Sequence, residues 1–433
     1  MTAAGVRRDR RAYGPRHRWV VLAVGVGAQA AFAAMFSGIP LTGVSMRAGY
    51  HLSTEALGLV LACLGLGVAA SDIAWGLLTD RLGDRRVLLT GLTATGALLV
   101  VMAAAVTPPD GAGVALLALC LTVAGALGGS VNGASGRAVM TWFGEGERGF
   151  AMSIRQTAIP VGGAAGVALL PWLASAYGFR AAYAVPAAFC LAAAAATWRW
   201  LHEPPPSAGP TPATGADPRP GLKARSPLRR WDVWRLALAG ALLTVPQFAV
   251  LSFTAIFLHD VKGEGATLAG LTVVIAQLGG GAARIWTGRR TDRTGTRRTH
   301  IRAIGALAGL AMAGAAVLTD APTPLTVTAL ALGGLLANSW HGVAYTEIAA
   351  MAGASRAGTA LGLLGTTLFA MGFLTPLLIP VVIAHTSWAA VWGLAAAASL
   401  LAVPLVPGEA RARRRGHSTP PRSLRADDVR ARR

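Results

Sequence analysis

Charged residues are scarce in this chain of 433 residues. Aspartate, glutamate, lysine and arginine make up 13% of it and hydrophobic residues 54%, whereas a soluble globular protein carries about 25% charged residues. Lysine is nearly absent, because all but two of the 39 basic residues are arginine, a bias that suggests a bacterial source. The shortage of charge argues against a soluble fold and predicts a membrane protein.

Several kinds of chemistry lack their sequence signatures. Cys63, Cys120 and Cys190 fall in apolar runs without the spacing of metal ligands, so neither a disulfide framework nor a metal site is expected. No Walker loop follows an apolar strand, which argues against ATP-driven transport by this chain. Neither a nucleophile elbow nor a His-Glu-x-x-His motif is present. We therefore expect no enzymatic activity and no cofactor.

Long apolar runs fill most of the sequence. A helix needs roughly 20 mostly apolar residues to cross a bilayer, because lipid cannot satisfy free backbone groups. Twelve runs meet this length, at about 19–38, 55–78, 87–106, 113–141, 150–176, 180–200, 232–258, 266–288, 302–319, 324–350, 357–384 and 387–406. The sequence therefore predicts an all-α membrane protein with twelve transmembrane helices.

A proline-rich stretch divides the runs into two groups of six. Residues 201–230 contain eight prolines and no long apolar run, which is typical of a linker. The predicted organisation is a basic N-terminal tail, a six-helix bundle, the linker, a second six-helix bundle and a basic C-terminal tail, at 1–18, 19–200, 201–230, 231–406 and 407–433.

Basic residues gather on one side of the predicted membrane. The two tails, the linker and the loops on their side hold 33 of the 39 lysines and arginines, whereas the opposite side holds Arg47, Arg180 and Lys262. The positive-inside rule places both termini in the cytoplasm, in a bacterial inner membrane. The net charge of +20 is thereby explained by topology and by attraction to lipid headgroups, so no nucleic-acid partner is expected.

A short loop occurs twice, after the second and the eighth predicted spans. The copies read Gly76-Leu-Leu-Thr-Asp80-Arg81-Leu-Gly83 and Gly288-Arg-Arg-Thr-Asp292-Arg293-Thr-Gly295. All four shared residues are 212 positions apart, and Arg148 and Arg356, before spans five and eleven, are 208 apart. These offsets indicate duplication of a six-helix unit.

The loop and its two positions resemble the signature of the major facilitator superfamily (MFS), and the resemblance extends over residues 19–406. It implies two pseudo-symmetric six-helix bundles that rock around a central site, act as a monomer, and carry a small molecule with a proton or another ion. It also implies that Asp80 and Asp292 belong to a cytoplasmic latch that closes in the outward-open state. Asp84 and Thr296 depart from the family, which often has a basic residue there.

The residues of the two loops are accordingly assigned to gating. We expect Gly83 and Gly295 to permit tight turns, and Asp80 and Asp292 to cap a helix N-terminus or pair with arginine. The alternative is that the loops only shape a turn and fix the topology. The gating set also includes one arginine inside span four, so that it comprises Gly76, Asp80, Arg81, Gly83, Arg137, Gly288, Asp292, Arg293 and Gly295.

Five charges lie within spans, where they are costly and therefore functional candidates. Asp72 and Arg284 are repeat equivalents, and so are Arg137 and Glu347, in each case with opposite charge. We predict ion pairs of Asp72 with Arg137 and of Arg284 with Glu347. Arg155 has no predicted partner, so it either snorkels to the headgroups or attracts an anionic substrate. Asp72 and Glu347 are candidates for proton coupling, with a role as gate or strut as the alternative.

Uncharged polar residues lie in the spans that line the cavity of this fold. His341 is a further candidate for proton coupling, because its charge changes near neutral pH. Hydrogen bonding between helices is the alternative role for these residues. With Arg155 and Arg284 added, the substrate-binding candidates are Gln29, Asn132, Arg155, Gln247, Arg284, Asn338, Trp340 and His341.

Arg284 bears on the substrate. Arg284-Ile-Trp-Thr-Gly288 is similar to the span-eight Arg-x-x-x-Gly of monocarboxylate and oxalate transporters, whose arginine binds the carboxylate, although spans one and eleven here contain no lysine or arginine. We expect a secondary active transporter for a small organic solute, with an organic anion favoured. The alternatives are a drug or metabolite efflux pump, or a membrane sensor without transport. The glycines near Pro160 do not match the antiporter motif of drug exporters and predict close helix packing.

Overall fold

The computed structural model describes residue 14 and residues 16–108, 113–202 and 225–408. Most of the predicted tails and linker therefore lies outside the described residues. The described chain is helical, without strands. The first half comprises α1 (His17–Leu41), α2 (Gly43–Gly49), α3 (Thr54–Leu82), α4 (Asp84–Ala105), α5 (Val114–Gly128), α6 (Ser130–Trp142) and α7 (Arg148–Trp200).

The second half begins after the linker with a short 3₁₀ turn, η3 (Pro227–Arg229). Another 3₁₀ turn, η4 (Ala354–Arg356), precedes the helix of span eleven. The helices of this half are α8 (Trp231–Lys262), α9 (Ala266–Thr294), α10 (Arg297–Val317), α11 (Thr323–Ser339), α12 (His341–Ala352), α13 (Ala357–His385) and α14 (Trp388–Leu405).

The prediction of an all-α, twelve-span fold is confirmed, although helices and spans do not correspond one to one. Ten helices of the described chain are long and apolar enough to cross a membrane when α5 and α6 are counted as one. One of them, α7, holds spans five and six, which meet at Gly178 with φ of 75°. Span ten is α11 followed by α12, with the break at Trp340.

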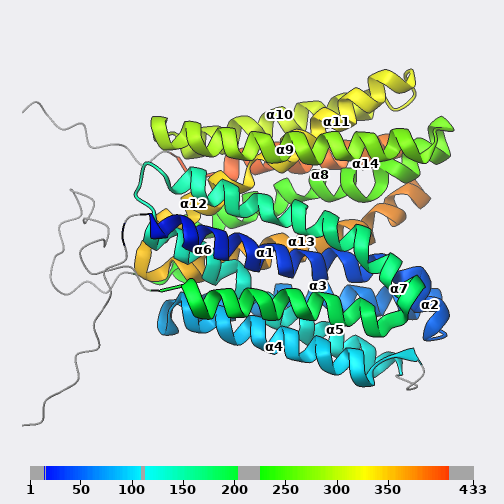
Figure 1. Cartoon of the computed structure of the whole chain (residues 1–433). Coiled ribbons are helices and arrows are strands. Elements are labelled where there is room, and N and C mark those ends of the chain that lie inside the picture. Colours follow the sequence, from blue (N-terminus) through cyan, green and yellow to red (C-terminus); the bar gives the residue numbers. More distant parts are fainter. Residues whose placement is uncertain (1–13, 15, 109–112, 203–224, 409–433) are drawn as a thin grey trace, which may run out of the picture.

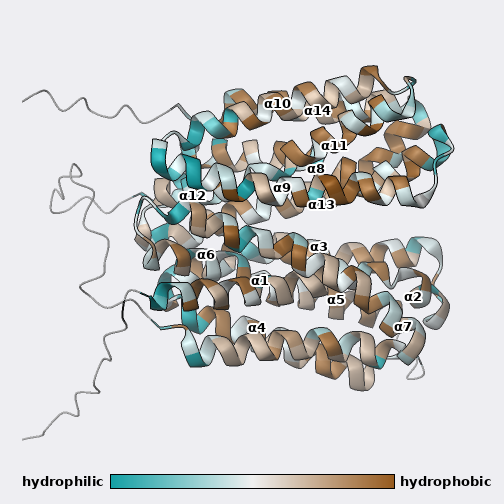
Figure 2. Cartoon of the chain, turned by 45° about the horizontal axis from the view of Figure 1, so that its top comes forward, coloured by the Kyte–Doolittle hydropathy of each residue, from teal (hydrophilic) through white to brown (hydrophobic). Residues whose placement is uncertain are grey.

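The two halves lie one above the other in Figure 2, and their helices run roughly parallel in both overall views. Large apolar side chains cover the outer surface: Leu278, Trp286 and Leu310 are 70%, 62% and 63% exposed. Exposed apolar area on this scale suits contact with lipid rather than with water.

Glycine lets helices within a half approach closely. A β-carbon at Gly162 or Gly166 of α7 would collide with the backbone of Ala30 or Ala34 of α1. This confirms that the glycines of span five serve close helix packing.

The ends of the described chain and of its two halves lie at one end of the bundle, which we call the basic end. There His17 Nε2 is 3.0 Å from the carbonyl oxygen of Trp200, and Arg302 donates to the carbonyl of Val406 at 2.7 Å. The loops at Gly83 and Gly295 are at this end as well, where the hydrophilic residues around α6 and α12 gather (Figure 2). The fold therefore places both signature loops beside the junction of the two halves.

Candidate functional site

The two signature loops turn as predicted. Gly83 ends α3 with φ of 88°, and Gly295 ends α9 with φ of 69°. Both values lie in the left-handed region that favours glycine. The turns let α4 and α10 start directly after α3 and α9. One turn before each glycine, an aspartate faces the opposite half.

Asp80 caps the N-terminus of α13 in the second half. Its carboxylate accepts hydrogen bonds from the backbone N–H groups of Gly358 and Thr359, both at 2.8 Å, and from the Thr359 hydroxyl at 2.6 Å. A β-carbon at Gly76 would collide with the Gly358 carbonyl, so glycine is required for this approach of α3 to α13. Free N–H groups and the helix dipole both favour a carboxylate here.

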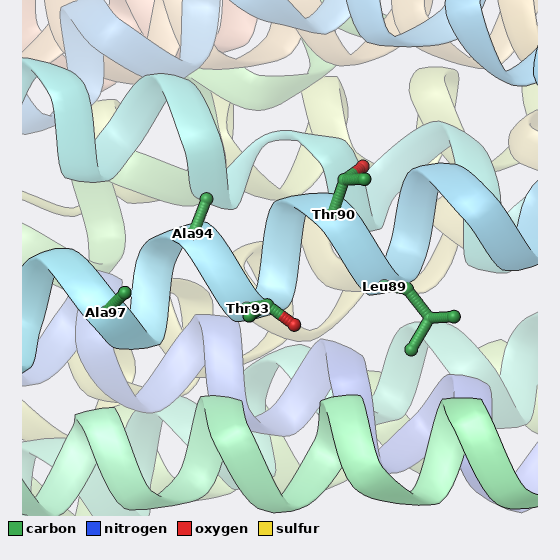
Figure 3. A pocket seen from close by; sticks show the side chains of 5 residues that line it. All are labelled: Leu89, Thr90, Thr93, Ala94 and Ala97. Atoms are coloured by element: carbon green, nitrogen blue, oxygen red, sulfur yellow. The ribbon is translucent and has the colours of Figure 1, made fainter.

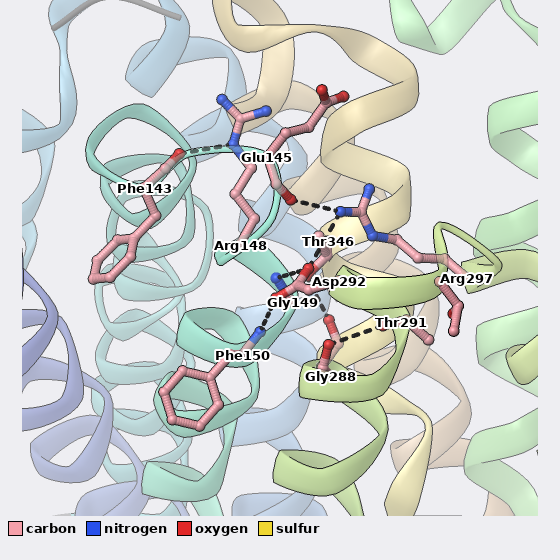
Figure 4. A network of polar contacts seen from close by, with 12 residues as sticks. Phe143, Glu145, Arg148, Gly149, Phe150, Gly288, Thr291, Asp292, Arg297 and Thr346 are labelled. Atoms are coloured by element: carbon pink, nitrogen blue, oxygen red, sulfur yellow. Dashed lines mark hydrogen bonds and ion pairs between the residues drawn. The ribbon is translucent and has the colours of Figure 1, made fainter.

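Asp292 makes the equivalent contact in the other direction (Figure 4). Its carboxylate accepts hydrogen bonds from the backbone N–H groups of Gly149 at 2.9 Å and Phe150 at 2.8 Å, at the start of α7. Arg297 adds a long contact of 3.4 Å to the same carboxylate. Gly288 abuts the carbonyl of Gly149, as Gly76 abuts that of Gly358. The prediction that both aspartates can cap a helix is confirmed, and each caps a helix of the opposite half.

The predicted ion pairs within each half are wrong. Arg137 binds Asp84 at 2.7 Å and lies 3.5 Å from Asp80, not beside Asp72. Glu347 binds Arg298 at 2.6 Å, not Arg284.

Depth along the helices explains the error. Asp72 precedes Asp80 by eight residues, which is about 12 Å of helix, so an arginine that reaches Asp80 cannot also reach Asp72. Arg284 is displaced from Asp292 by the same amount. Arg137 and Glu347 therefore belong to the basic end, whereas the two deeper charges belong to a separate central cluster.

Arg155 is the first arginine of this central cluster and is fully buried. It donates to the Ser135 hydroxyl at 2.8 Å, to Gln156 Oε1 at 3.2 Å and to Gln29 Oε1 at 2.6 Å. It also donates to the carbonyl of Asn132 at 2.7 Å and lies 5.9 Å from the ring centroid of Tyr345. Arg155 thus does not snorkel to the headgroups, and all these acceptors are uncharged.

Arg284 is the second arginine and is 2% exposed. It donates to the carbonyl and to the side-chain oxygen of Asn338, the latter at 3.1 Å. It also donates to the carbonyl of Gln156 at 3.0 Å. Gln156 therefore binds Arg284 of the second half through its backbone and Arg155 of its own half through its side chain.

Asp72 completes the cluster from α3. Both carboxylate oxygens accept from Asn132 Nδ2, at 3.2 and 3.1 Å. Asn132 in turn accepts from Gln29 Nε2 at 3.1 Å. Asp72 is fully buried and, within the described chain, no lysine, arginine or histidine forms an ion pair with it.

The other candidates lie at or outside the edge of this cluster. Trp340 is fully buried and stacks on His341, with the ring centroids 4.0 Å apart. Gln247 is half-buried, and its Oε1 finds no hydrogen-bond partner among the described residues. Arg81 and Arg293 are exposed at the basic end.

A family model described as the Major Facilitator Superfamily matches residues 24–374 of the chain. The chain belongs to the major facilitator superfamily. An uncharacterised MFS-type transporter of Mycobacterium tuberculosis is 30% identical over 391 residues, which cover 90% of this chain and 85% of the relative. The MFS assignment indicates a transporter rather than an enzyme.

Solved MFS structures share the fold at low identity. A proton:xylose symporter bound to 6-bromo-6-deoxy-D-glucose has a TM-score of 0.73 at 17% identity, covering 91% of this chain and 97% of that one. The human organic anion transporter MFSD10 has a TM-score of 0.72 at 16% identity, covering 91% and 100%. These likenesses show the MFS fold alone.

Sequence reasoning missed three residues of the central cluster, namely Gln156, Ser135 and Gly365, the last of which faces the Asp72 carboxylate without a side chain. Gln156 could have been noticed as a polar neighbour of Arg155 in an apolar span. Ser135 and Gly365 carry no such signal, because small residues are common in membrane helices for packing alone.

One groove lies apart from these polar clusters, along α4 (Figure 3). It has no charged side chain, and none of the predicted site residues lines it. Its lining consists of Leu89, Thr90, Thr93, Ala94 and Ala97. Among the described residues, no group of three His, Cys, Asp or Glu side chains could hold a metal ion.

Proposed function

We propose that this MFS protein moves a small organic anion, such as a carboxylate, by proton-coupled alternating access. The observation that carries the proposal is the convergence of Arg155 and Arg284, one from each half, on Gln156. A solute held between them contacts both halves, as alternating access around a central site requires.

The charge balance of the central cluster favours an anion. Arginine stays protonated in proteins, so Arg155 and Arg284 bring two positive charges against the single carboxylate of Asp72. Their hydrogen-bond acceptors are amide, hydroxyl and carbonyl oxygens, which carry no charge. A carboxylate would supply the missing negative charge and match the planar guanidinium groups.

Arg284 also has donors to spare. A guanidinium carries five N–H groups, and the hydrogen bonds of Arg284 to described residues use three of them. Two N–H groups therefore remain for a ligand, enough for a bidentate carboxylate. Trp340 and His341 lie beside Asn338, where they would offer the solute a stacking surface.

The gating residues would act at the basic end. We propose that Asp80 and Asp292 hold that end shut while the solute site faces the other way, and that both caps break when the halves rock apart. The basic end would face the cytoplasm of a bacterial inner membrane, because most lysines and arginines gather there.

The structural neighbours do not select the substrate, since they include symporters of xylose and fucose as well as an organic anion transporter. The assignment to an anion therefore rests on the two arginines. The proton is favoured as the coupling ion because the cluster contains a buried acid, Asp72.

The test is transport by purified protein in lipid vesicles with an imposed pH gradient. Labelled lactate, oxalate and succinate would be compared with xylose and with ethidium. We expect gradient-driven uptake of a carboxylate that is lost in Arg284→Gln and kept in Arg180→Gln, a matched change of an exposed arginine. Movement of ethidium instead would favour the efflux pump, and binding of a carboxylate without movement would favour a sensor.

A further inference from the structure

Asp72 sits in a notch formed by two glycines, one between α5 and α6 and one on α13. A β-carbon at Gly129, between α5 and α6, would lie 2.7 Å from its Oδ1. A β-carbon at Gly365 of α13 would overlap its Oδ2. The carboxyl group thus occupies space that only glycine leaves open, and one wall of the notch belongs to the opposite half.

The surroundings of this carboxyl group are nearly free of charge. Its hydrogen bonds come from the side chain of Asn132 on α6. Next to it, α13 presents Gly362 and Gly365, which have no side chain. The ionisable groups that interact with it electrostatically are Arg155 of α7 and Tyr345 of α12, and neither binds it directly. A buried carboxylate without a paired cation is costly, whereas the neutral acid is much less so.

A chain of amides connects Asp72 to the anion site, and all its hydrogen bonds point the same way. Arg155 Nη2 donates to Gln29 Oε1 at 2.6 Å, and Gln29 Nε2 donates to Asn132 Oδ1 at 3.1 Å. The Nδ2 group of Asn132 then donates to Asp72. Hydrogen bonds in such a chain polarise one another, so the charge on Asp72 affects how strongly Arg155 is held.

From this geometry we propose that Asp72 is the group that carries the coupled proton, and that the Asn132–Gln29 chain links its protonation to anion binding at Arg155. The inference rests on the proposed function. In the present conformation the notch is closed and Asp72 is protonated, so the chain pulls weakly on Arg155, whose charge is available to the anion.

Rocking of the halves withdraws Asp72 from Gly365, because the two residues belong to different halves. Water then reaches the carboxyl group, which releases its proton to the solvent on the open side. The carboxylate draws Asn132, Gln29 and Arg155 toward itself and weakens the hold on the anion. One proton and one anion thus leave on the same side, which describes a symporter.

Glu347, the other acid considered for coupling, is placed differently, and so is Asp80 of the gating set. Glu347 is bound directly by Arg298 of its own half at the basic end. Asp80 is held by three donors of α13. Of the acids considered for coupling, Asp72 is the one to which no cation is bound within the described chain.

The first experiment needs no substrate. Infrared spectra of the purified full chain at neutral pH report the C=O band of a protonated carboxylic acid. We expect this band in the native protein and in Glu347→Gln, and its loss in Asp72→Asn, which keeps the shape of the side chain in the notch. An unchanged band in Asp72→Asn would overturn the proposal, whether or not any anion is transported.

The second experiment separates coupling from binding, with lactate, oxalate and succinate in lipid vesicles. Asp72→Asn is expected to lose accumulation driven by a pH gradient by roughly tenfold or more while keeping exchange of the anion at equal pH. Asn132→Leu is expected to keep the infrared band but to lose the effect of pH on exchange. Gradient-driven accumulation by Asp72→Asn would refute the proton role, whereas loss of all anion movement in the native protein would refute only the proposed substrate.

If Asp72→Asn does not fold, Gly365→Ala serves instead. The added methyl group would push the carboxyl group from the notch, so the infrared band should weaken while Asp72 is kept. A band of native strength in that variant would contradict the role of the notch.

Discussion

The two halves of the molecule agree at the basic end and differ in the centre. Asp80 and Asp292 are repeat equivalents, and each caps a helix of the opposite half, α13 or α7. Eight residues earlier in each helix, Asp72 and Arg284 are repeat equivalents of opposite charge. The symmetric pair holds the halves together, and the asymmetric pair gives the central cluster its chemistry.

The helices that face these residues differ in the same way. Asp72 fits against Gly365 of α13, whereas Arg284 bonds the backbone of Gln156 on α7. Gly365 and Gln156 occupy corresponding positions, because they follow the first capped residues, Gly358 and Gly149, by seven residues each. At corresponding positions, the first half therefore places an acid in a notch of α13, and the second half places an arginine that donates to a carbonyl of α7.

The largest effect on transport is expected from removing the charge of Arg284, the basic member of the asymmetric pair. Arg284→Gln should lower the initial rate of anion uptake by roughly 10–100-fold, since a hydrogen bond to a charged group is worth about 1.5–3 kcal/mol. The uptake rate of Arg284→Lys should lie between those of Arg284→Gln and the native protein, because lysine keeps the charge but loses the planar guanidinium group. Uptake into lipid vesicles measures this, and equal rates for Gln and native protein would exclude Arg284 from the site.

The next largest effect is expected from removing one of the two symmetric helix caps. Asp80→Ala should shift the protein toward an open basic end more than Asp292→Ala does, because Asp80 accepts three hydrogen bonds from the opposite half and Asp292 accepts two. Loss of a capping group costs about 0.5–2 kcal/mol. Distances between spin labels at the basic end would report the shift, and the reverse order of the two variants would contradict the comparison.

A smaller effect comes from exchanging charges within a pair. Each single change, Glu347→Arg or Arg298→Glu, should lower the stability by about 1–2 kcal/mol, because it leaves a hydrogen-bonding group without its partner. The double variant should recover most of this loss. Arg137→Asp with Asp84→Arg should recover less, because the new aspartate would lie beside Asp80, which Arg137 now approaches at 3.5 Å. Thermal unfolding in detergent measures the stability of both double variants. Full recovery by Arg137→Asp with Asp84→Arg would show that an aspartate beside Asp80 does not destabilise the protein.

The smallest effect is expected from replacing the glutamines of the corresponding helices α1 and α8, Gln29 and Gln247. Gln29→Ala should weaken anion uptake, since Gln29 joins Arg155 to Asn132. Gln247→Ala should change it by less than about twofold, because no hydrogen bond of described residues ties Gln247 to the cluster. A larger loss from Gln247→Ala than from Gln29→Ala would place the solute in the second half.

The sequence by itself determined the fold, its duplication and the two signature loops. Apolar length, the repeated motif and the distribution of arginine act locally along the chain or along the membrane normal, so they can be read without contacts. The turns at Gly83 and Gly295 were predictable for the same reason, whereas the sequence left open whether Asp80 and Asp292 cap a helix or pair with arginine.

Only the tertiary structure decided which charges meet. Repeat symmetry paired Asp72 with Arg137 and Arg284 with Glu347, yet two turns of helix separate the members of each pair in depth. Partners across the halves, such as Gln156 for Arg284 and Gly365 for Asp72, depend on how the helices pack against one another. A glycine in the sequence does not reveal which group will occupy the space beside it, because it contributes only the space that a missing side chain leaves.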